Sequence, residues 1–305
     1  MQQLETDLLP LLSSLVAINS INPTLSGGPG EEEIATFCTR WLRERGITAE
    51  AVECAAGRFN VYAIIPGQGH GQPILLNSHL DTVGVEGMES PFTLRREGER
   101  VLGRGAYDMK ASVALEMLLA AHFIRHPPPG DLYLTLVADE EERSIGMEAL
   151  IRDWLPRVTP PGGAIVLEPT EEEIGLGHKG FGWLEVTLRG RAAHGSRPEE
   201  GIDAICLLGP LLVALSRLQQ RLEVETPHPL LGHGSVHAST VEGGSAWSIY
   251  PARATLRYER RTLPGMTETD LLAELEDLLA EAGLAAGMIE SRNLVFLRPP
   301  HLVSA

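Results

Sequence analysis

ILLNSHLDTV, residues 74–83, is the stretch from which the fold of this chain is predicted. Its apolar start predicts a buried strand over residues 74–77. His79 and Asp81 follow that strand and therefore emerge at its carboxyl end, where open α/β sheets bind their ligands. His79 is the first candidate metal ligand. Asp81 could accept a hydrogen bond from the other ring nitrogen of His79 and so fix the tautomer of the ring.

The segments around this strand alternate between β-rich and helical patterns. An amphipathic helix opens the chain, and the Gly/Pro-rich loop INPTLSGGPG separates it from a second helix that ends at Gly46. That helix covers residues 31–45, a later one covers 109–125, and β-rich runs cover 60–65, 132–137 and 164–167. This alternation favours an α/β domain with a largely parallel sheet between helices.

The pattern changes after His178-Lys179-Gly180. Strands are predicted over residues 183–189, 234–240, 252–257 and 289–297, and helices over 202–222 and 268–282. The resulting βαββαβ order predicts a ferredoxin-like insert of ~120 residues.

Composition narrows the class of protein. The 41 Asp and Glu residues outnumber the 25 Lys and Arg residues, and the formal charge of -16 argues against nucleic acid or an anionic membrane as a partner. No apolar run approaches the ~18 residues of a membrane span, and the N-terminus lacks the basic region of a signal peptide, so we expect a cytoplasmic protein. Cys38, Cys54 and Cys206 are widely spaced, which predicts buried thiols and no disulfide framework.

A second candidate ligand lies in GRGAYDMK, residues 103–110. The Gly-rich turn allows a close approach of the backbone, and a helix is predicted to start near Met109. Asp108 could simply cap that helix, because Asp is a preferred N-cap residue. It could also bind a metal, and the two roles are compatible.

Two more strands end in acids. LTLVADEEERS carries Asp139 to Glu142 after an apolar strand, and AIVLEPT delivers Glu168 before Pro169. Each could be an ordinary solvated strand end. Adjacent carboxylates can also have different roles, because one can bind a metal while the other transfers protons. Taken together with His79, the nitrogen and oxygen donors suit zinc or another borderline divalent metal.

In order along nearly the whole chain, these motifs resemble those of the zinc hydrolases that include aminoacylase, acetylornithine deacetylase, succinyl-diaminopimelate desuccinylase and carboxypeptidase G. The resemblance implies a zinc-exopeptidase-like catalytic domain over residues 1–178 and an inserted lid and dimerisation domain over 179–297. Residues 298–305 would begin the return to the catalytic domain. Because the family's chains continue further, with a histidine of the second metal site, we expect the C-terminal part of that domain to be missing.

The resemblance also implies a role for each motif in holding two divalent metal ions, zinc first, with cobalt or manganese as alternatives. His79 would bind one ion, oriented by Asp81, and Asp108 would bridge both ions. Glu168 would share the ion of His79. The second site could be incomplete in this chain.

In the acidic run, the resemblance implies that Glu140 is the general acid/base and that Glu141 is a ligand of the other ion. The extra Glu142 leaves this register ambiguous by one position.

Two motifs of the insert add substrate contacts. AAHGSRPEEGIDAI resembles a family signature that makes His194 the oxyanion-stabilising histidine, offered across a homodimer interface; the alternative is a surface histidine on a turn. SIYPARATLRYERRTLPG resembles the segment whose arginine grips a substrate carboxylate, here Arg261, with Arg260 as the alternative. Ser248 and Glu259 depart from the usual Asn and Asp, which puts the substrate identity in doubt.

The expected function is the hydrolysis of an N-acyl amino acid by a metal-activated water. A di- or carboxypeptidase acting on short peptides is the alternative within the family, and a truncated, non-catalytic metal- or partner-binding protein is the alternative outside it. The glycine-rich joints near residues 177–182 suggest that the insert closes over its substrate. His301 precedes the expected catalytic histidine, so we expect a loop residue there and not a ligand.

Overall fold

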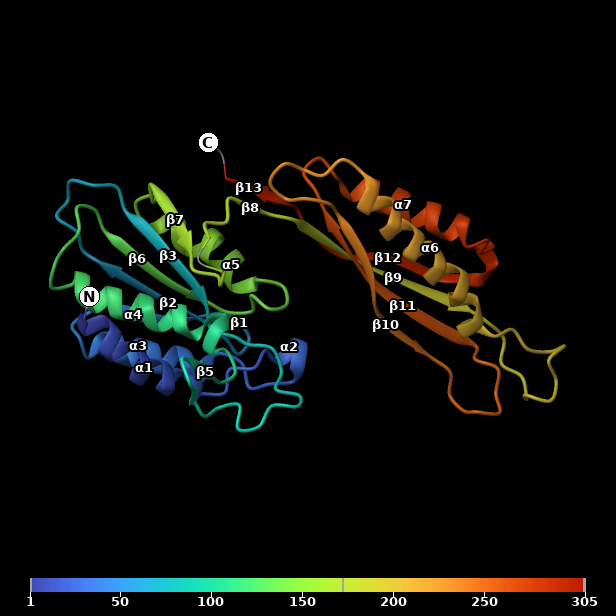
Figure 1. Ribbon diagram of the computed structural model, residues 1–305, viewed down its shortest axis with the longest axis horizontal. Coiled ribbons are helices and arrows are strands. Elements are labelled where there is room, and N and C mark those ends of the chain that lie inside the picture. Colours follow the sequence, from blue (N-terminus) through green and yellow to red (C-terminus); the bar gives the residue numbers. More distant parts are fainter. Residues whose placement is uncertain (1, 172, 304–305) are drawn as a thin grey trace. The chain divides into compact units, whose positions relative to one another are not determined.

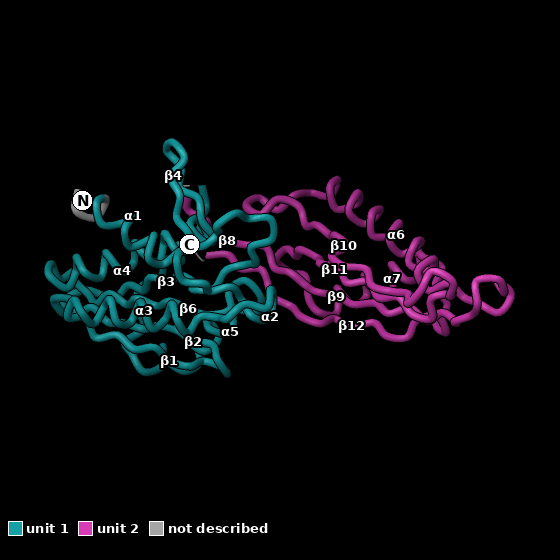
Figure 2. Tube along the Cα trace, turned by 90° about the horizontal axis from the view of Figure 1, so that it is seen from below, with its two compact units in different colours: residues 1–172 teal, residues 173–305 magenta. Residues whose placement is uncertain are grey.

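The computed structural model describes residues 2–171 and 173–303, without the side chains of residues 2–5. The chain divides into two compact units, residues 1–172 and 173–305 (Figures 1 and 2). Across the described residues, the model contains no helix that is both long and apolar enough to cross a membrane.

The first unit is built on a five-stranded sheet with the order β1-β2-β6-β3-β7. The strands are β1 (Ala49–Ala55), β2 (Arg58–Ile65), β3 (Ile74–His79), β6 (Leu132–Val137) and β7 (Gly163–Val166). A separate hairpin pairs β4 (Arg95–Glu97) with β5 (Arg100–Leu102).

This sheet is mixed, so the prediction of a largely parallel sheet is wrong for one side of it. β3 pairs in parallel with β6 and β7, whereas β2 pairs antiparallel with both β1 and β6. Helices connect β3 to β6 and β6 to β7, as strands of one sheet that run in the same direction require. β1 was not predicted, and a tight turn at Gly57 (φ 70°) returns the chain directly into β2. A connection without a helix reverses the chain direction, which explains the antiparallel side.

Helices cover both faces of this sheet (Figure 1). α1 (Gln2–Val16), α3 (Glu32–Arg43) and α4 (Ala111–Phe123) share one core with the strands, whereas α5 (Ile145–Ala149) and the short helices η2 (Leu150–Trp154) and η3 (Leu155–Arg157) follow β6 on the other side. Alternate strand residues separate the cores, so Val61 lies in the first and Tyr62 in the second. The centre of the sheet is therefore buried on both faces.

The predicted helices are present with shifted ends. α3 buries Ile34, Cys38 and Leu42, which share one helix face, and Gly46 follows it with φ 78°. α4 begins at Ala111, two residues after the predicted start. The Gly/Pro-rich loop also contains a short helix, α2 (Pro23–Ser26), which the sequence analysis did not predict.

The second unit has the predicted βαββαβ order. It comprises β9 (Gly180–Arg189), α6 (Ala204–Val224), β10 (Ser235–Gly243), β11 (Arg253–Thr262), α7 (Glu268–Glu281), the short helix η4 (Ala286–Met288) and β12 (Ile289–Arg298). The strands pair antiparallel in the order β10-β11-β9-β12, a ferredoxin-like arrangement. Leucines of α6 and α7 pack on inward-facing residues of β9 and β11 to form the core.

Two smaller predictions are wrong. Cys38 is buried, but Cys54 is half-buried and Cys206 exposed, so only one of the three thiols lies in a core. His301 does not lie in a loop, because β13 (His301–Leu302) pairs with β8 (Gly177–His178). The ring centroids of His178 and His301 are 6.0 Å apart, and the His301 side chain is exposed on this short strand.

Candidate metal centre

The predicted ligands of the first unit lie together at one sheet edge. His79 ends β3, Glu140 and Glu141 follow β6, and Glu168 follows β7. Because β6, β3 and β7 are parallel neighbours, their carboxyl ends meet at the same edge. Two groups of possible ligands form there, each with its ligand atoms within 4.8 Å of one another: His79, Glu140 and Glu168, and His79, Asp108 and Glu141.

His79 belongs to both groups and its side chain is 1% exposed. Its Nε2 faces the carboxylates, at 2.9 Å from Asp108 Oδ1 and 3.9 Å from both Glu140 Oε2 and Glu168 Oε1. On the other side, Nδ1 lies 2.9 Å from the backbone oxygen of Asp81 and 3.6 Å from its carboxylate. The shorter contact indicates that the backbone carbonyl orients the ring, which leaves the Asp81 carboxylate free for other contacts.

Asp108 reaches the cluster from the turn before α4. The turn, η1 (Ala106–Lys110), starts after Gly105, whose φ of 72° is one that L side chains rarely adopt. The capping interpretation of Asp108 is wrong, because the N-cap residue of α4 is Lys110 and no side chain caps that helix end. The Asp108–Met109 peptide bond is cis. Half of the Asp108 side chain is exposed, so the carboxylate can reach a bound ion.

The carboxylates of this cluster are electrostatically frustrated. Burial raises the pKa of Glu140, Glu141 and Glu168, and neighbouring carboxylates raise it further against the attraction of His79. The pKa values of Glu141 and Glu168 reach about 7. Burial lowers the pKa of His79, but the hydrogen bond to Asp108 and the nearby negative charge of the Asp81 carboxylate outweigh it and raise the pKa well above its ordinary value.

A divalent cation would relieve this repulsion, and the donor set of one imidazole and several carboxylates fits zinc or a similar ion. The residues present therefore fit the predicted metals. Glu142 is in neither ligand group among the described residues; its carboxylate lies 3.7 Å from Arg143.

A buried polar network, which was not predicted from the sequence, lies behind this cluster. Asn22, Glu31, Arg58 and Asp139 are all less than a tenth exposed, and hydrogen bonds connect them with Asp81. Only the Asn22-Pro23 pair gave a local signal, since an Asn before a proline is a common helix cap. Buried partners far apart in sequence leave no local pattern.

The candidate substrate residues of the second unit differ in exposure. His194 is exposed, and its Nδ1 lies 2.8 Å from the Ser196 hydroxyl and 3.2 Å from the Ser196 backbone nitrogen, so its Nε2 side is the one left for a substrate. Arg260 is buried and its Nε lies 2.9 Å from Glu274. Arg261 is exposed; Glu259 holds its Nε at 2.6 Å, and its guanidinium lies 5.1 Å from the centre of the Phe181 ring.

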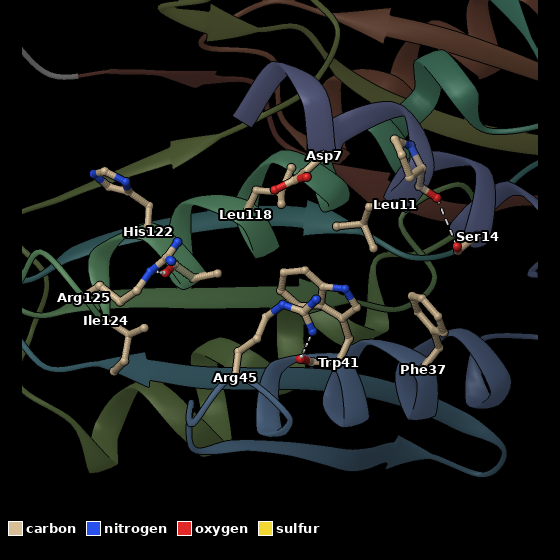
Figure 3. Close-up of a pocket in the computed structure, with 12 residues that line it drawn as sticks. Asp7, Leu11, Ser14, Phe37, Trp41, Arg45, Leu118, His122, Ile124 and Arg125 are labelled. Atoms are coloured by element: carbon tan, nitrogen blue, oxygen red, sulfur yellow. Dashed lines mark hydrogen bonds between the residues drawn. The ribbon is translucent and has the colours of Figure 1, made fainter. Parts of the chain in front are cut away.

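A cleft of the first unit lies away from this cluster. It has a volume of about 610 Å³ and is lined by residues from and just after α1, α3 and α4, among them Leu11, Phe37, Trp41 and His122 (Figure 3). The guanidinium of Arg45 stacks 3.6 Å from the centre of the Trp41 ring at its wall. This cleft lies in the helical layer. The titratable cluster at the sheet edge is therefore the candidate site for metal binding and catalysis.

Histidine and carboxylate donors meet at the carboxyl ends of parallel strands. The fold and the site therefore define the class of this chain as an α/β protein with a candidate metal centre. Residues 75–294 match the model of peptidase family M20/M25/M40, and the chain belongs to this family. The family resemblance predicted from the motifs is thereby confirmed.

Individual relatives carry two kinds of name. The chain is 32% identical over 295 residues to a probable carboxypeptidase of Aspergillus clavatus, covering 90% of this chain and 62% of that protein. It is 31% identical over 285 residues to the acetylornithine deacetylase of Proteus mirabilis, covering 90% and 70%. The chain thus spans less than two thirds of the length of the first of these relatives.

The fold is also that of solved structures. An M20 family metallo-carboxypeptidase from Sulfolobus solfataricus superposes with a TM-score of 0.74 at 20% identity, over 95% of this chain and 79% of that one. This likeness concerns the fold alone.

Proposed function

We propose that this chain is a metal-dependent amide hydrolase that removes the acyl group from an N-acyl amino acid. The observation that carries the proposal is the convergence of His79, Asp108, Glu140, Glu141 and Glu168 at one sheet edge. The similarity to an acetylornithine deacetylase over 90% of the chain supports deacylation.

We assign two divalent metal ions to this edge, zinc first and cobalt or manganese as substitutes. His79 and Glu168 would hold one ion, Glu141 the other, and Asp108 would bridge them. When bound, the ions polarise the scissile carbonyl and lower the pKa of the attacking water.

Glu140 is the proposed general acid/base. It accepts a proton from the attacking water and delivers it to the amide nitrogen as the C–N bond breaks. Burial and the carboxylates of Asp81 and Asp108 raise its pKa, despite the attraction of His79. A raised pKa suits a group that must both take and return a proton near neutral pH.

We assign substrate recognition to the second unit, acting as a lid that closes over the substrate. His194, with its Nε2–H as donor, would stabilise the oxyanion of the tetrahedral intermediate. Arg261 would bind the substrate carboxylate through its terminal nitrogens, and its exposure favours it over the buried, paired Arg260. We also propose that two copies pair through this unit, so that His194 serves the partner's site.

We further propose that additional polypeptide completes the first unit in the active enzyme. β7 is an edge strand with an apolar sequence, yet Ile165 and Val166 are 54% and 53% exposed. Exposed apolar edges are usually covered in stable proteins.

The cytoplasmic location read from the sequence stays a prediction.

A di- or carboxypeptidase is the second candidate, favoured by the similarity to a probable carboxypeptidase. Both activities need the same metals, base and carboxylate clamp, so the side chain of the substrate separates them. Zinc-loaded protein would be assayed side by side on N-acetylornithine, N-succinyl-diaminopimelate and a set of dipeptides. We expect a higher kcat/KM for an N-acyl amino acid; preferential cleavage of dipeptides would favour the second candidate, and no turnover of any substrate would count against both.

A further inference from the structure

The Asp81 carboxylate holds the backbone of the acidic turn. The N–H of Glu140 donates to Asp81 Oδ1 (3.0 Å), and the N–H of Glu141 donates to Asp81 Oδ2 (3.2 Å). Each carboxylate oxygen thus fixes one of two successive peptide groups. Because these groups belong to the proposed acid/base and to a proposed ligand, the position of Asp81 sets the positions of both.

The Asn22 side chain fixes the Asp81 carboxylate by a hydrogen bond. Its Nδ2 carries two hydrogens and donates one to Asp81 Oδ2 (2.8 Å) and one to Asp139 Oδ1 (2.9 Å). Its Oδ1 accepts the backbone N–H groups of Thr24 and Leu25 at the start of α2. Every hydrogen-bonding position of the amide is therefore used, and the side chain is completely buried.

The bridge joins two carboxylates that would otherwise repel each other. Asp81 and Asp139 both lie in the interior at the end of their strands, and one neutral amide lies between them. An amide that donates to both stabilises the charged form of each without adding a charge. A carboxylate in the place of the amide would reverse both interactions.

The backbone around Asn22 is fixed by the segment that follows β3 and carries Asp81. The N–H of Asn22 donates to Thr82 O (2.8 Å), and the N–H of Thr82 donates to Ser20 O (3.1 Å). Gly28 packs against the same segment so closely that a Cβ there would lie 2.2 Å from Ile21 O. The backbone position of Asn22 is therefore fixed, and with it the position from which its side chain contacts Asp81 and Asp139.

Arg58 anchors the far end of the network. Its Nη1 donates to Asp139 Oδ1 (2.9 Å), and its Nε and Nη2 donate to the two oxygens of Glu31 (2.7 and 2.5 Å). All three side chains are buried, and Asp139 has the left-handed φ of 64°. The strained residue that opens the acidic turn is thus held by Arg58 and Asn22 together.

We propose that Asn22 is a positioning residue that fixes Glu140 and Glu141 for metal binding and proton transfer, acting through Asp81 and Asp139. Its part in catalysis rests on the proposed hydrolase function. Its part in metal binding is independent of which substrate is cleaved.

The test uses two variants that keep the helix cap and change only the bridge. Asp and Ser both cap helices well, so Asn22→Asp and Asn22→Ser preserve the start of α2. Asn22→Asp places a carboxylate against two others, and Asn22→Ser removes the bridge without adding charge. Leu42→Ala is the control, because it leaves a cavity in the core without touching this network.

The first readout is zinc affinity, measured by calorimetry on the full chain with Zn²⁺ alone. Changes to partners behind metal ligands typically reduce affinity or activity about 10–100-fold, and we expect Asn22→Asp at the upper end and Asn22→Ser at the lower. The visible spectrum of the Co²⁺-loaded variants should also change, since the ligand carboxylates move. Leu42→Ala should lower the melting temperature but keep the zinc affinity and the Co²⁺ spectrum.

The second readout is kinetic. With zinc saturating, we expect a lower kcat in both Asn22 variants and little change in KM, because Glu140 moves and the substrate contacts do not. Wild-type zinc affinity and wild-type kcat in folded Asn22→Ser would overturn the proposal, whatever the melting temperature. If the wild type binds zinc but cleaves no substrate, the hydrolase proposal fails, and the zinc affinity of the variants still decides the role of Asn22.

Discussion

The two units of this chain both combine helices with one main β-sheet, but their strands run in different directions. The first has a mixed sheet between helices, and three of its strands run in parallel to one edge. The second has an antiparallel sheet with its core on the side of α6 and α7. Parallel strands bring their carboxyl ends together, whereas antiparallel strands alternate their ends between the two edges.

The difference accounts for where the chemistry lies. Donors converge around the buried His79 at the edge of the first sheet, where the Asp108 and Glu140 side chains are partly exposed. In the second unit the candidate residues His194 and Arg261 are exposed and carry no shared cluster within the described residues. We therefore expect changes in the first unit to affect metal binding and the chemical step. In the second unit, changes at Arg261 should affect substrate binding, and changes at His194 should affect the chemical step without loss of metal.

The largest expected effect comes from the three successive glutamates. Glu140→Gln should lower kcat about 10²–10⁴-fold, the usual contribution of a general acid/base, with the metal content unchanged. Glu141→Gln should instead lower the metal content, and Glu142→Gln should change neither. Steady-state kinetics with metal analysis by plasma mass spectrometry checks the series. Near-wild-type turnover in Glu140→Gln, or loss of turnover in Glu142→Gln alone, would refute this register.

Metal removal should destabilise the first unit and leave the stability of the second unchanged. A ligand present at 1,000 times its Kd stabilises the folded state by about 4 kcal/mol, and that stabilisation should be confined to the first unit. Hydrogen exchange with and without a chelator would compare β6 with β9. We expect faster exchange in β6 alone; an equal change in both strands would contradict the assignment of the metals to one unit.

Arg261→Met should raise KM and leave the metal content unchanged. Hydrogen bonds to a charged group contribute about 1.5–3 kcal/mol, which corresponds to about 10–150-fold in kcat/KM. Arg257→Met is a matched control on the same strand, where the arginine pairs with Glu185 and Glu242. If both variants show the same kinetics as the wild type, Arg261 does not bind the substrate carboxylate.

A pH dependence of stability is also expected, confined to the first unit. Burial in the core raises the pKa of Glu116 from 4.5 to about 8, although a hydrogen bond from Ser78 opposes this. Between these values the folded state holds a proton that the unfolded chain has released. The contribution of Glu116 to the free energy of unfolding therefore falls as pH rises, by up to about 1.4 kcal/mol per pH unit, and this loss ends above pH 8.

Glu116→Gln keeps an acceptor for Ser78 and removes the titration. Urea unfolding between pH 5 and 9 should show the variant gaining stability relative to wild type up to pH 8 and no further. Thr187→Val, which breaks the buried Thr187–Thr255 contact of the second unit, should show a constant difference from wild type over this range. A constant difference for Glu116→Gln as well would show that Glu116 does not carry this proton.

The sequence predicted features whose cause is local. His79 and Glu168 follow apolar strands, so their placement at a sheet edge could be read from a few residues. The direction of β2 could not be read in this way, because it depends on a loop without a helix between β2 and β3. Arg58 and Asn22 were missed for a related reason. Their partners lie far away in the sequence, and only the folded chain shows that these polar groups are buried together.

The central claim is that one sheet edge of the first unit binds the metals. The most direct test is the zinc content per chain, measured by plasma mass spectrometry after purification without chelator, of wild type, His79→Ala and Arg261→Met. Because His79 belongs to both ligand groups, we predict bound zinc in wild type and Arg261→Met and a lower zinc content in His79→Ala. Zinc retained by His79→Ala at the wild-type level, or absent from all three proteins, would contradict the claim.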